Sequence, residues 1–406
     1  MSPQAHPEEL PVLCLNIGSS SVKFALFLLG GKEEARLAEG AVERIGMQDG
    51  YIWVRDVQKE ARDEGYRDFA DHTAAIDALF ASLGSMDFPN PTAVGHRIVH
   101  GGAGYAAPAM VDSQLLATLR ELVPFAPLHL PSEIVGIEAV AGQFPGLPQV
   151  ACFDTAFHRR MPELAQRLPL PREFWDGGLR RYGFHGLSYE YILDALGPAA
   201  QGRVVIAHLG NGASMAAVRD GLPVDTTMGF TPTGGLMMGT RTGDLDPGVL
   251  LYLMTERGYD SAGLEHLVNY RSGLLGVSAL SSDVKTLLDK SGSDPNAAQA
   301  VEMFCYHARA HVGALAAALG GLDTLVFTGG IGERAAPVRE GICRGLEHLG
   351  IHINPRRNSL HAEIISVPES PCMVRVMKTN EDLIIARHTR DLISSAKYEF
   401  TRAEKR

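Results

Sequence analysis

The chain has 406 residues, a net charge of −10 and 45% hydrophobic residues, which predicts a folded protein with more than one hydrophobic core. The acidic balance disfavours a nucleic-acid partner, because such a partner requires a positive field. No apolar run is long enough for a membrane span, residues 1–10 lack secretion-signal features, and the five cysteines form no Cys-x-x-Cys pair, so we expect a cytoplasmic protein with reduced thiols.

The first predicted element is a hairpin that includes residues 12–23, VLCLNIGSSSVK, and continues into the apolar run FALFLL. Its turn contains Asn16, Gly18 and three serines, and Lys23 follows. Glycine allows close backbone approach, and the hydroxyl, amide and ammonium groups suit a phosphate. The segment is not a Walker loop, because G-x-x-x-x-G-K-[ST] is missing. These residues alone favour neither a phosphate loop nor an ordinary core hairpin.

The next segments predict a helix and a short strand. Residues 71–83 place apolar side chains at helical spacing, and Gly84 is expected to end that helix. In GHRIVHGG, His96 and His100 are four residues apart, but the neighbouring glycines favour a strand and turn over a metal-binding helix. We therefore expect these histidines to serve packing and hydrogen bonding. Arg97 is predicted either to form a salt bridge or to bind a carboxylate or phosphate.

Two further segments carry single polar side chains of interest. Residues 150–158, VACFDTAFH, predict a buried strand ending at Asp154, a position where α/β folds bind ligands, although Asp154 could equally cap a helix. Residues 179–189, LRRYGFHGLSY, predict a glycine-containing loop that presents His185, with a surface loop as the alternative.

Residues 203–221, RVVIAHLGNGASMAAVRDG, repeat the pattern of the first hairpin. A shift of 192 positions places Val12 on Val204 and Asn16 on His208. Two related hairpins that begin two halves of a chain predict duplicated domains facing a common cleft, although two independent loops could also look alike.

The second half predicts a long loop and a long helix. Residues 231–247, TPTGGLMMGTRTGDLDP, form a glycine-rich loop with Arg241, and ordered loops of this length are usually functional. Residues 295–319 predict a helix with Asp294 as its N-cap and Gly320 after its end.

The last segments predict a strand with a glycine loop at residues 324–333, helical structure at 336–349, a strand at 375–379 and a helix at 380–393. Together with the two hairpins, this strand and loop imply an actin-like, duplicated nucleotide-binding fold. The lysine, arginines and carboxylates in and near these loops suit phosphoryl transfer, because that reaction depends on positioning the phosphoryl group and neutralising its charge.

An ordered set of motifs across residues 12–385 resembles the acetokinase family. The motifs are NIGSSSVK, GHRIVHGG, APLHLP, FDTAFH, RYGFHG, HLGNGAS, MGFTPTGGLMMGTRTGDLDPG, SSDVK, FTGGIGE and KTNED. The resemblance implies an α/β, duplicated ribonuclease-H-like (actin-like) two-domain fold with its active site in the interdomain cleft. It implies an acyl and phosphate-side domain at residues 1–157 plus 383–406, and a nucleotide-binding domain at residues 158–382.

The same resemblance implies reversible, direct in-line transfer of the ATP γ-phosphoryl group to acetate, giving acetyl phosphate and ADP. It also implies Mg²⁺, with Mn²⁺ as an alternative metal, a homodimer, and neither nucleic acid nor membrane as a partner. The alternatives are propionate or butyrate as the acceptor, or a nucleotide-binding module or ATPase without acyl transfer.

By match to the family's motifs, the resemblance assigns roles to individual residues. The catalytic residues would be Asp154, Arg97, Arg241 and His185. The nucleotide and its phosphates would be bound by Lys23, Ser21, His208, Leu209, Gly210, Asn211, Gly212, Asp283, Val284, Lys285, Gly330, Ile331, Gly332, Glu333 and Arg334. The acyl pocket would be lined by Arg97, Val99, Leu128, Phe184 and Pro232, and the metal would be bound by Asn16 and Glu381.

Some positions depart from the family's usual residues, and they leave the preferred nucleotide and the preferred acyl chain length open. Lys285 and Arg334 replace the usual arginine and asparagine on the nucleotide side. Leu130 and Gly234 replace the usual asparagine and glutamate next to the acyl pocket. The acceptor is a carboxylate that resembles a Glu side chain, with a pKa of about 4.3, so it is ionised at neutral pH. We therefore expect Asp154 to orient Arg97, Arg241 or the metal's ligands rather than to take a proton.

Overall fold

The computed structural model describes residues 9–30, 33–59 and 62–404, and the chain divides into two compact units. The first unit comprises Met1–Ala156 and Asn380–Arg406, and the second comprises Phe157–Thr379. The division falls after residues 156 and 379, whereas the sequence-based boundaries lie after 157 and 382. None of the described helices combines the length and hydropathy needed to cross a bilayer.

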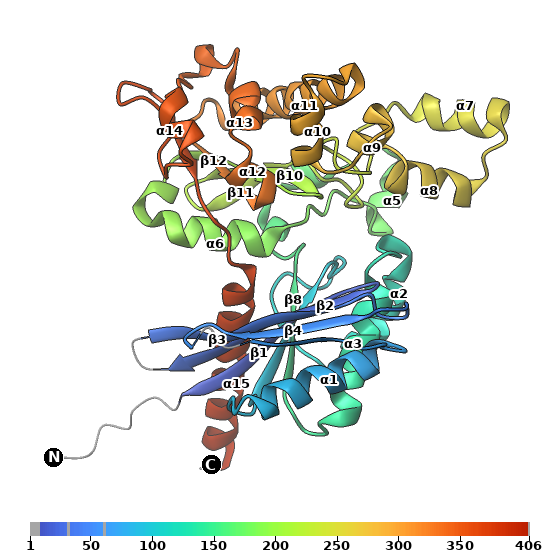
Figure 1. Ribbon diagram of the computed structural model, residues 1–406, viewed down its shortest axis with the longest axis vertical. Helices are drawn as coiled ribbons and strands as arrows, with labels where there is room; N and C mark the ends of the chain where they lie inside the picture. Colours follow the sequence, from blue (N-terminus) through green and yellow to red (C-terminus); the bar gives the residue numbers. More distant parts are fainter. Residues whose placement is uncertain (1–8, 31–32, 60–61, 405–406) are drawn as a thin grey trace. The chain divides into compact units, whose positions relative to one another are not determined.

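In the described part of the first unit, an eight-stranded mixed sheet has the order β5-β4-β3-β2-β1-β6-β8-β7 (Figure 1). Its strands are β1 (Leu10–Gly18), β2 (Ser21–Gly30), β3 (Glu33–Glu43), β4 (Tyr51–Asp56), β5 (Arg62–Tyr66), β6 (Ala93–Ile98), β7 (Ala109–Met110) and β8 (Gln149–Phe153). Its helices are α1 (His72–Ser85), α2 (Ser113–Glu121), η1 (Val123–Phe125), α3 (Leu130–Gln143) and α15 (Glu381–Glu404).

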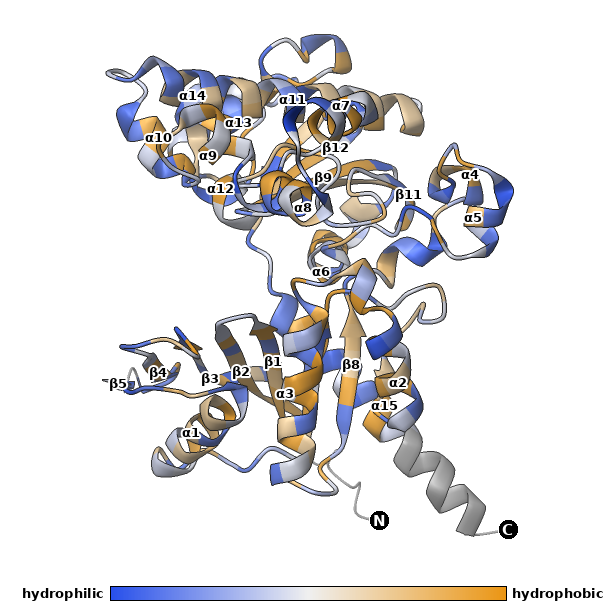
Figure 2. Cartoon of the chain, turned by 90° about the vertical axis from the view of Figure 1, so that its right-hand side faces the viewer, coloured by the Kyte–Doolittle hydropathy of each residue, from blue (hydrophilic) through white to orange (hydrophobic). Residues whose placement is uncertain are grey.

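Helices cover both faces of this sheet, and alternation along β1 explains why. Leu13, Leu15 and Ile17 point into a core shared with α1 and α3, and Gly136 of α3 lies so close that an added Cβ would be 1.9 Å from Ile17. The opposite face of β1 carries Cys14 and Asn16 and lies against α15. Because both faces are covered, β8 is hydrophobic along nearly its whole length (Figure 2).

In the described part of the second unit, a five-stranded sheet has the order β11-β10-β9-β12-β13. Its strands are β9 (Arg203–Leu209), β10 (Ala213–Arg219), β11 (Leu222–Thr226), β12 (Thr324–Thr328) and β13 (Met373–Val376). Its helices are η2 (Phe157–Arg160), α4 (Glu163–Gln166), α5 (Arg172–Asp176), α6 (Gly186–Leu196), η3 (Gly197–Ala200), α7 (Pro247–Arg257), α8 (Ser261–Tyr270), α9 (Gly273–Ser278), α10 (Val284–Lys290), α11 (Pro295–Leu319), α12 (Gly329–Arg334), α13 (Ala336–Cys343), η4 (Glu347–Leu349) and α14 (Pro355–Ser359).

The two sheets share one topology. β3-β2-β1-β6-β8 and β11-β10-β9-β12-β13 each contain three antiparallel strands followed by two parallel ones. The predicted shift of 192 residues also holds in the register, because Val12 pairs with Ala93 where Val204 pairs with Thr324. The prediction of a duplicated α/β fold is confirmed. The turns differ, because two residues join β1 to β2 and three join β9 to β10.

Several predicted elements match the structure closely. Both hairpins are present, residues 231–246 form a loop, and α11 has Asp294 as its N-cap and Gly320 in the left-handed conformation at its C-cap. His96 is buried with its Nε2 2.7 Å from Gln149 Oε1, which agrees with the packing and hydrogen-bonding role expected for this histidine.

Other predictions were wrong in their bounds or their type. α1 continues through Gly84 to Ser85, and the left-handed residue after it is Asp87, with φ 59°. The glycine loop expected at residues 329–333 is instead the short helix α12. Gly329, with φ 77°, allows the sharp turn out of β12 that starts this helix. The last strand covers Met373–Val376 rather than residues 375–379, and α15 extends to Glu404.

Candidate active-site residues

In the first unit, Arg97 and Asp154 form an ion pair at the ends of two neighbouring parallel strands. Arg97 Nε donates to Asp154 Oδ1 at 3.2 Å, and Nη2 donates to Oδ2. Asp154 is fully buried directly after β8, and its backbone N–H donates to the carbonyl of Ile98. The Arg97 side chain keeps 18% of its surface exposed. The pair therefore presents a guanidinium held in a fixed direction, with part of its surface accessible.

Asn16 and Glu381 lie against the same guanidinium. Arg97 Nη1 donates to Asn16 Oδ1 at 3.2 Å, and Arg97 Nε is 3.9 Å from Glu381 Oε2. Burial raises the pKa of Glu381, and Arg97 partly offsets this effect. Burial also acts to lower the pKa of Arg97, but Asp154 and Glu381 outweigh it and raise that pKa. Arg97 therefore stays charged at any pH where the protein is folded.

The phosphate-binding candidates of the first hairpin lie close to this group. Lys23 is exposed and sits directly opposite Asn16 in the β1–β2 register, so both side chains project from the same face of the sheet. Ser21 pairs with Gly18 beside the turn, and a Cβ on Gly18 would lie 3.2 Å from the Ser21 hydroxyl. This glycine therefore keeps the backbone near Ser21 open.

Glu133, on the first turn of α3, is a buried carboxylate that was not among the predicted site residues. Both of its carboxylate oxygens accept from the Val99 backbone N–H, at 3.3 and 3.1 Å. Burial raises the pKa of Glu133 to about 8, even though Arg97 acts to lower it. Val99 is itself buried, and Leu128 is half-buried just before α3.

We expect Glu133→Gln to make the protein's stability less dependent on pH. Because the pKa of Glu133 is raised in the folded state, its contribution to stability is complete below its ordinary value of about 4.3 and is lost as the pH rises through about 8. The variant should therefore melt at about the same temperature as the wild type at pH 4 and roughly 3 °C or more above it at pH 9. Thermal unfolding at both pH values measures this.

Glu138→Gln provides a matched control on the same helix, because Glu138 is exposed and pairs with Arg120 at the surface. We expect its melting temperature to follow that of the wild type at both pH values. A Glu133→Gln melting curve that shows the full pH dependence of the wild type would contradict the prediction.

In the second unit, His185 and His208 stack face to face, with ring centroids 4.3 Å apart. His185 caps α6 in the left-handed conformation and its Nδ1 is 2.9 Å from Ser214 Oγ, whereas His208 Nδ1 is 2.8 Å from Ser188 Oγ. The expected loop at residues 179–189 is therefore a turn that becomes helical from Gly186. The hydrogen bonds at both Nδ1 atoms fix the ring orientations.

Arg241 and His185 converge on the turn between β9 and β10. A Cβ on Gly212 would lie 3.6 Å from both Arg241 Nη1 and His185 Nε2. Arg241 Nη1 also donates to the carbonyl of Pro232 at 3.2 Å, and Phe184 is buried next to His185. The absence of a side chain at residue 212 therefore leaves space in front of a guanidinium and an imidazole.

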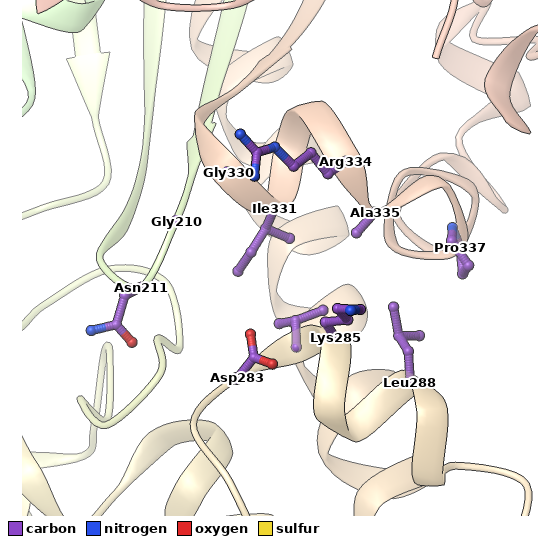
Figure 3. A pocket seen from close by; sticks show the side chains of 11 residues that line it. Gly210, Asn211, Asp283, Lys285, Leu288, Gly330, Ile331, Arg334, Ala335 and Pro337 are labelled. Atoms are coloured by element: carbon purple, nitrogen blue, oxygen red, sulfur yellow. The ribbon is translucent and has the colours of Figure 1, made fainter. Parts of the chain in front are cut away.

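A cavity of about 650 Å³ lies in the second unit between α10 and the segment formed by α12 and the start of α13 (Figure 3). It is lined by Gly210, Asn211, Asp283, Val284, Lys285, Leu288, Gly330, Ile331, Arg334, Ala335 and Pro337. Figure 3 shows Asp283, Lys285 and Leu288 facing Ile331, Ala335 and Pro337, with Asn211 at one end. Asp283 accepts from the backbone N–H and the hydroxyl of Thr286, and these bonds lower its pKa.

Most of the residues predicted to bind nucleotide line this cavity, but not all of them do. Gly332 packs under the end of β12, and Glu333, His208, Leu209 and Gly212 also lie outside the lining. Leu288, Ala335 and Pro337 also line the cavity, and they were not predicted from the sequence. Leu288 is four residues after Val284 on α10, so helical spacing could have identified it.

The model of the Acetokinase family matches residues 11–387. The chain belongs to the acetokinase family. Among its relatives in this family, the acetate kinase of Rhodopseudomonas palustris is 46% identical over 390 residues, which covers 93% of this chain and 97% of that protein. The acetate kinase of Methylocella silvestris is also 46% identical, over 399 residues, covering 94% and 98%.

Solved structures of the family have the same fold. The acetate kinase of Porphyromonas gingivalis is 38% identical with a TM-score of 0.86, and it covers 95% of this chain and 100% of its own. A propionate kinase from Francisella tularensis is 34% identical with a TM-score of 0.89, covering 94% and 99%. The predicted α/β class and the predicted membership of the acetokinase family are both confirmed.

Proposed function

We propose that this chain is an acetate kinase that transfers the γ-phosphoryl group of ATP to acetate, reversibly and in line, giving acetyl phosphate and ADP. The observation that carries the proposal is the Arg97–Asp154 pair, a guanidinium held by a buried carboxylate with part of its surface exposed. Such an arginine serves an anionic acceptor, whereas a module that only binds nucleotide has no use for it.

We assign acetate and the transferring phosphoryl to two arginines. Arg97 binds the acetate carboxylate, and Arg241 neutralises the charge that develops on the phosphoryl oxygens. His185 donates a hydrogen bond from Nε2 to the same oxygens, because Ser214 already engages its Nδ1. Lys23 and Ser21, with the turn at residues 208–212, bind the triphosphate, and the cavity of the second unit holds the adenosine.

Magnesium would be held by Asn16 and Glu381 on the protein side. The ligand atoms suit this ion, because Asn16 Oδ1 and the Glu381 carboxylate are hard oxygen ligands, both beside the Arg97 guanidinium. Within the described residues, no group of three or more His, Cys, Asp or Glu side chains could hold a metal. This donor set fits Mg²⁺, which keeps several waters and substrate phosphates as ligands. The ion would neutralise phosphate charge.

A hydroxamate assay tests the proposed activity. Hydroxylamine converts an acyl phosphate into a hydroxamate. We expect hydroxamate to form from the protein, ATP, Mg²⁺ and acetate together, and not when any one of these four components is left out. If the purified protein forms no hydroxamate with acetate, propionate or butyrate while it hydrolyses ATP, the kinase proposal is rejected in favour of an ATPase.

Propionate is the second candidate acceptor, because a propionate kinase of solved structure is 34% identical to this chain. We assign Val99, Leu128, Phe184 and Pro232 to the acyl pocket. One methylene in a fitted apolar pocket changes specificity by about 1–3 kcal/mol, or 10–200-fold. We expect kcat/KM for acetate to exceed that for propionate by about tenfold and that for butyrate by more. A kcat/KM for propionate ten times that for acetate would reassign the substrate.

We further propose that the enzyme is a cytoplasmic homodimer without nucleic-acid or membrane partners. All five cysteines are buried and none of them is in a disulfide, which suits a reducing compartment. α7 carries Leu251, Tyr252 and Met254 exposed on its surface, and such side chains are typical of an interface. Light scattering of the purified protein should give the mass of two chains.

A further inference from the structure

A buried arginine supports one wall of the cavity from behind. Arg339, on α13, has none of its surface exposed, and it lies outside the set of described residues that line the cavity. α12 and the residue that follows it supply Gly330, Ile331, Arg334 and Ala335 to this wall. The arginine is therefore separated from any ligand by the wall itself.

Every N–H donor of Arg339 has an acceptor. Nη1 donates to the carbonyls of Gly332 at 2.7 Å and Glu333 at 3.0 Å. Nε donates to Asn358 Oδ1 at 2.8 Å, and Nη2 donates to the Asn358 carbonyl at 2.8 Å and to His361 Nδ1 at 3.0 Å. Because a guanidinium has five donors in a fixed plane, these contacts fix the position of α12 relative to α14.

The charge of Arg339 is balanced by carbonyl groups rather than by a carboxylate. In the part of the chain that the structure describes, no acidic side chain lies within ion-pair distance of it. Burial lowers the pKa of Arg339 to about 10, so the side chain is still protonated at neutral pH. Two of its acceptors are carbonyls at the C-terminal end of α12, where a positive charge is favourable.

α12 needs this external support. It has six residues, Gly329–Arg334, and three of them are glycines, the residue with the lowest helix propensity after proline. The last carbonyls of any helix lack hydrogen-bond donors within the helix. In α12, Arg339 donates to two of these carbonyls. Without the guanidinium, the residues of α12 that face the cavity would lose their fixed orientation.

We propose that Arg339 is a positioning residue for the nucleotide: by holding the carbonyls of Gly332 and Glu333, it sets the orientation of Ile331 and Arg334 in the cavity wall. The proposal relies on the proposed function only for naming the ligand as an adenine nucleotide. It assigns Arg339 no contact with the nucleotide and no part in the transfer step.

The test is Arg339→Gln, together with Arg339→Lys, which keeps the charge but loses the fork of donors. For both variants we expect the Kd for ADP by calorimetry and the KM for ATP to rise about tenfold. kcat at saturating ATP and KM for acetate should stay within twofold of the wild type. Arg309→Gln is the matched control, because Arg309 donates to the carbonyl of Gly341 on α13 but not to α12. Its Kd for ADP should change less than twofold.

An unchanged Kd for ADP in folded Arg339→Gln, or a KM for acetate that rises as much as that for ATP, would overturn the proposal. If Arg339→Gln does not fold, His361→Gly decides, because His361 is exposed and has φ 52°, a conformation that glycine adopts readily. Its Kd for ADP should rise about threefold, and an unchanged value would reject the proposal. Calorimetry with ADP needs no acyl transfer, so a wild type that forms no acetyl phosphate would reject only the proposed function.

Discussion

Arg241→Ala is expected to lower kcat for acetyl phosphate formation by about 10³-fold while ATP binding stays within a few-fold of the wild type. An arginine that stabilises the charge of the transferring phosphoryl contributes about 10³–10⁵ in kcat in GTP-hydrolysing proteins. Its guanidinium and His185 both lie 3.6 Å from a Cβ position on Gly212, so alanine would remove one of two donors that converge there. Hydroxamate formation measures the rate, and calorimetry with ADP measures binding.

The backbone around Arg241 should survive the substitution, because main-chain groups hold it. The carbonyl of Arg241 accepts from the N–H of Met238, and Thr242 N–H donates to the carbonyl of Val268. Arg257→Ala on α7 is the control, since the exposed Arg257 side chain forms its hydrogen bond and its cation–π contact with the exposed Tyr252. We expect full activity from it. If Arg241→Ala keeps more than a tenth of the wild-type kcat, the phosphoryl must be neutralised by other residues.

The duplicated fold could be predicted from sequence because local and global signals agree in the strands. The hairpins at β1–β2 and β9–β10 combine apolar runs with glycine turns, and the shift between them reappears as equivalent pairing with β6 and β12. The same agreement made α11 predictable, since Asp294, Pro295 and Gly320 mark its ends. These elements need no information from distant residues.

Features that depend on distant contacts could not be predicted in the same way. The segment GGIGER, which forms α12, has the composition of a loop but is helical in the structure. Arg339, five residues after its end, donates to two of its carbonyls. Glu133 appears in sequence as an ordinary helix residue, and only packing shows that both its oxygens face Val99. The sequence could not decide whether Arg97 forms a salt bridge or binds an anion, because its partner Asp154 lies 57 positions away in the chain.

The role of Asp154 follows from the protonation state of the acceptor. Acetate resembles a Glu side chain, with a pKa of about 4.3, so it is ionised at neutral pH and needs no base. Asp154 is buried and both of its oxygens face Arg97, so we expect it to orient that guanidinium. Asp154→Asn and Asp154→Ala should therefore both lower kcat/KM for acetate, by roughly 10²-fold, because each leaves Arg97 without its bidentate partner.

A double-mutant cycle separates orientation from proton transfer. If Asp154 acts through Arg97, the double variant Arg97→Ala/Asp154→Ala should be no slower than Arg97→Ala alone, because the second change removes nothing further. Additive losses would point to an independent role for Asp154. The acid limb of kcat/KM gives a second readout: we expect it to keep its position in Asp154→Asn. If the limb disappears in that variant, Asp154 carries a proton during the reaction and the orienting role is wrong.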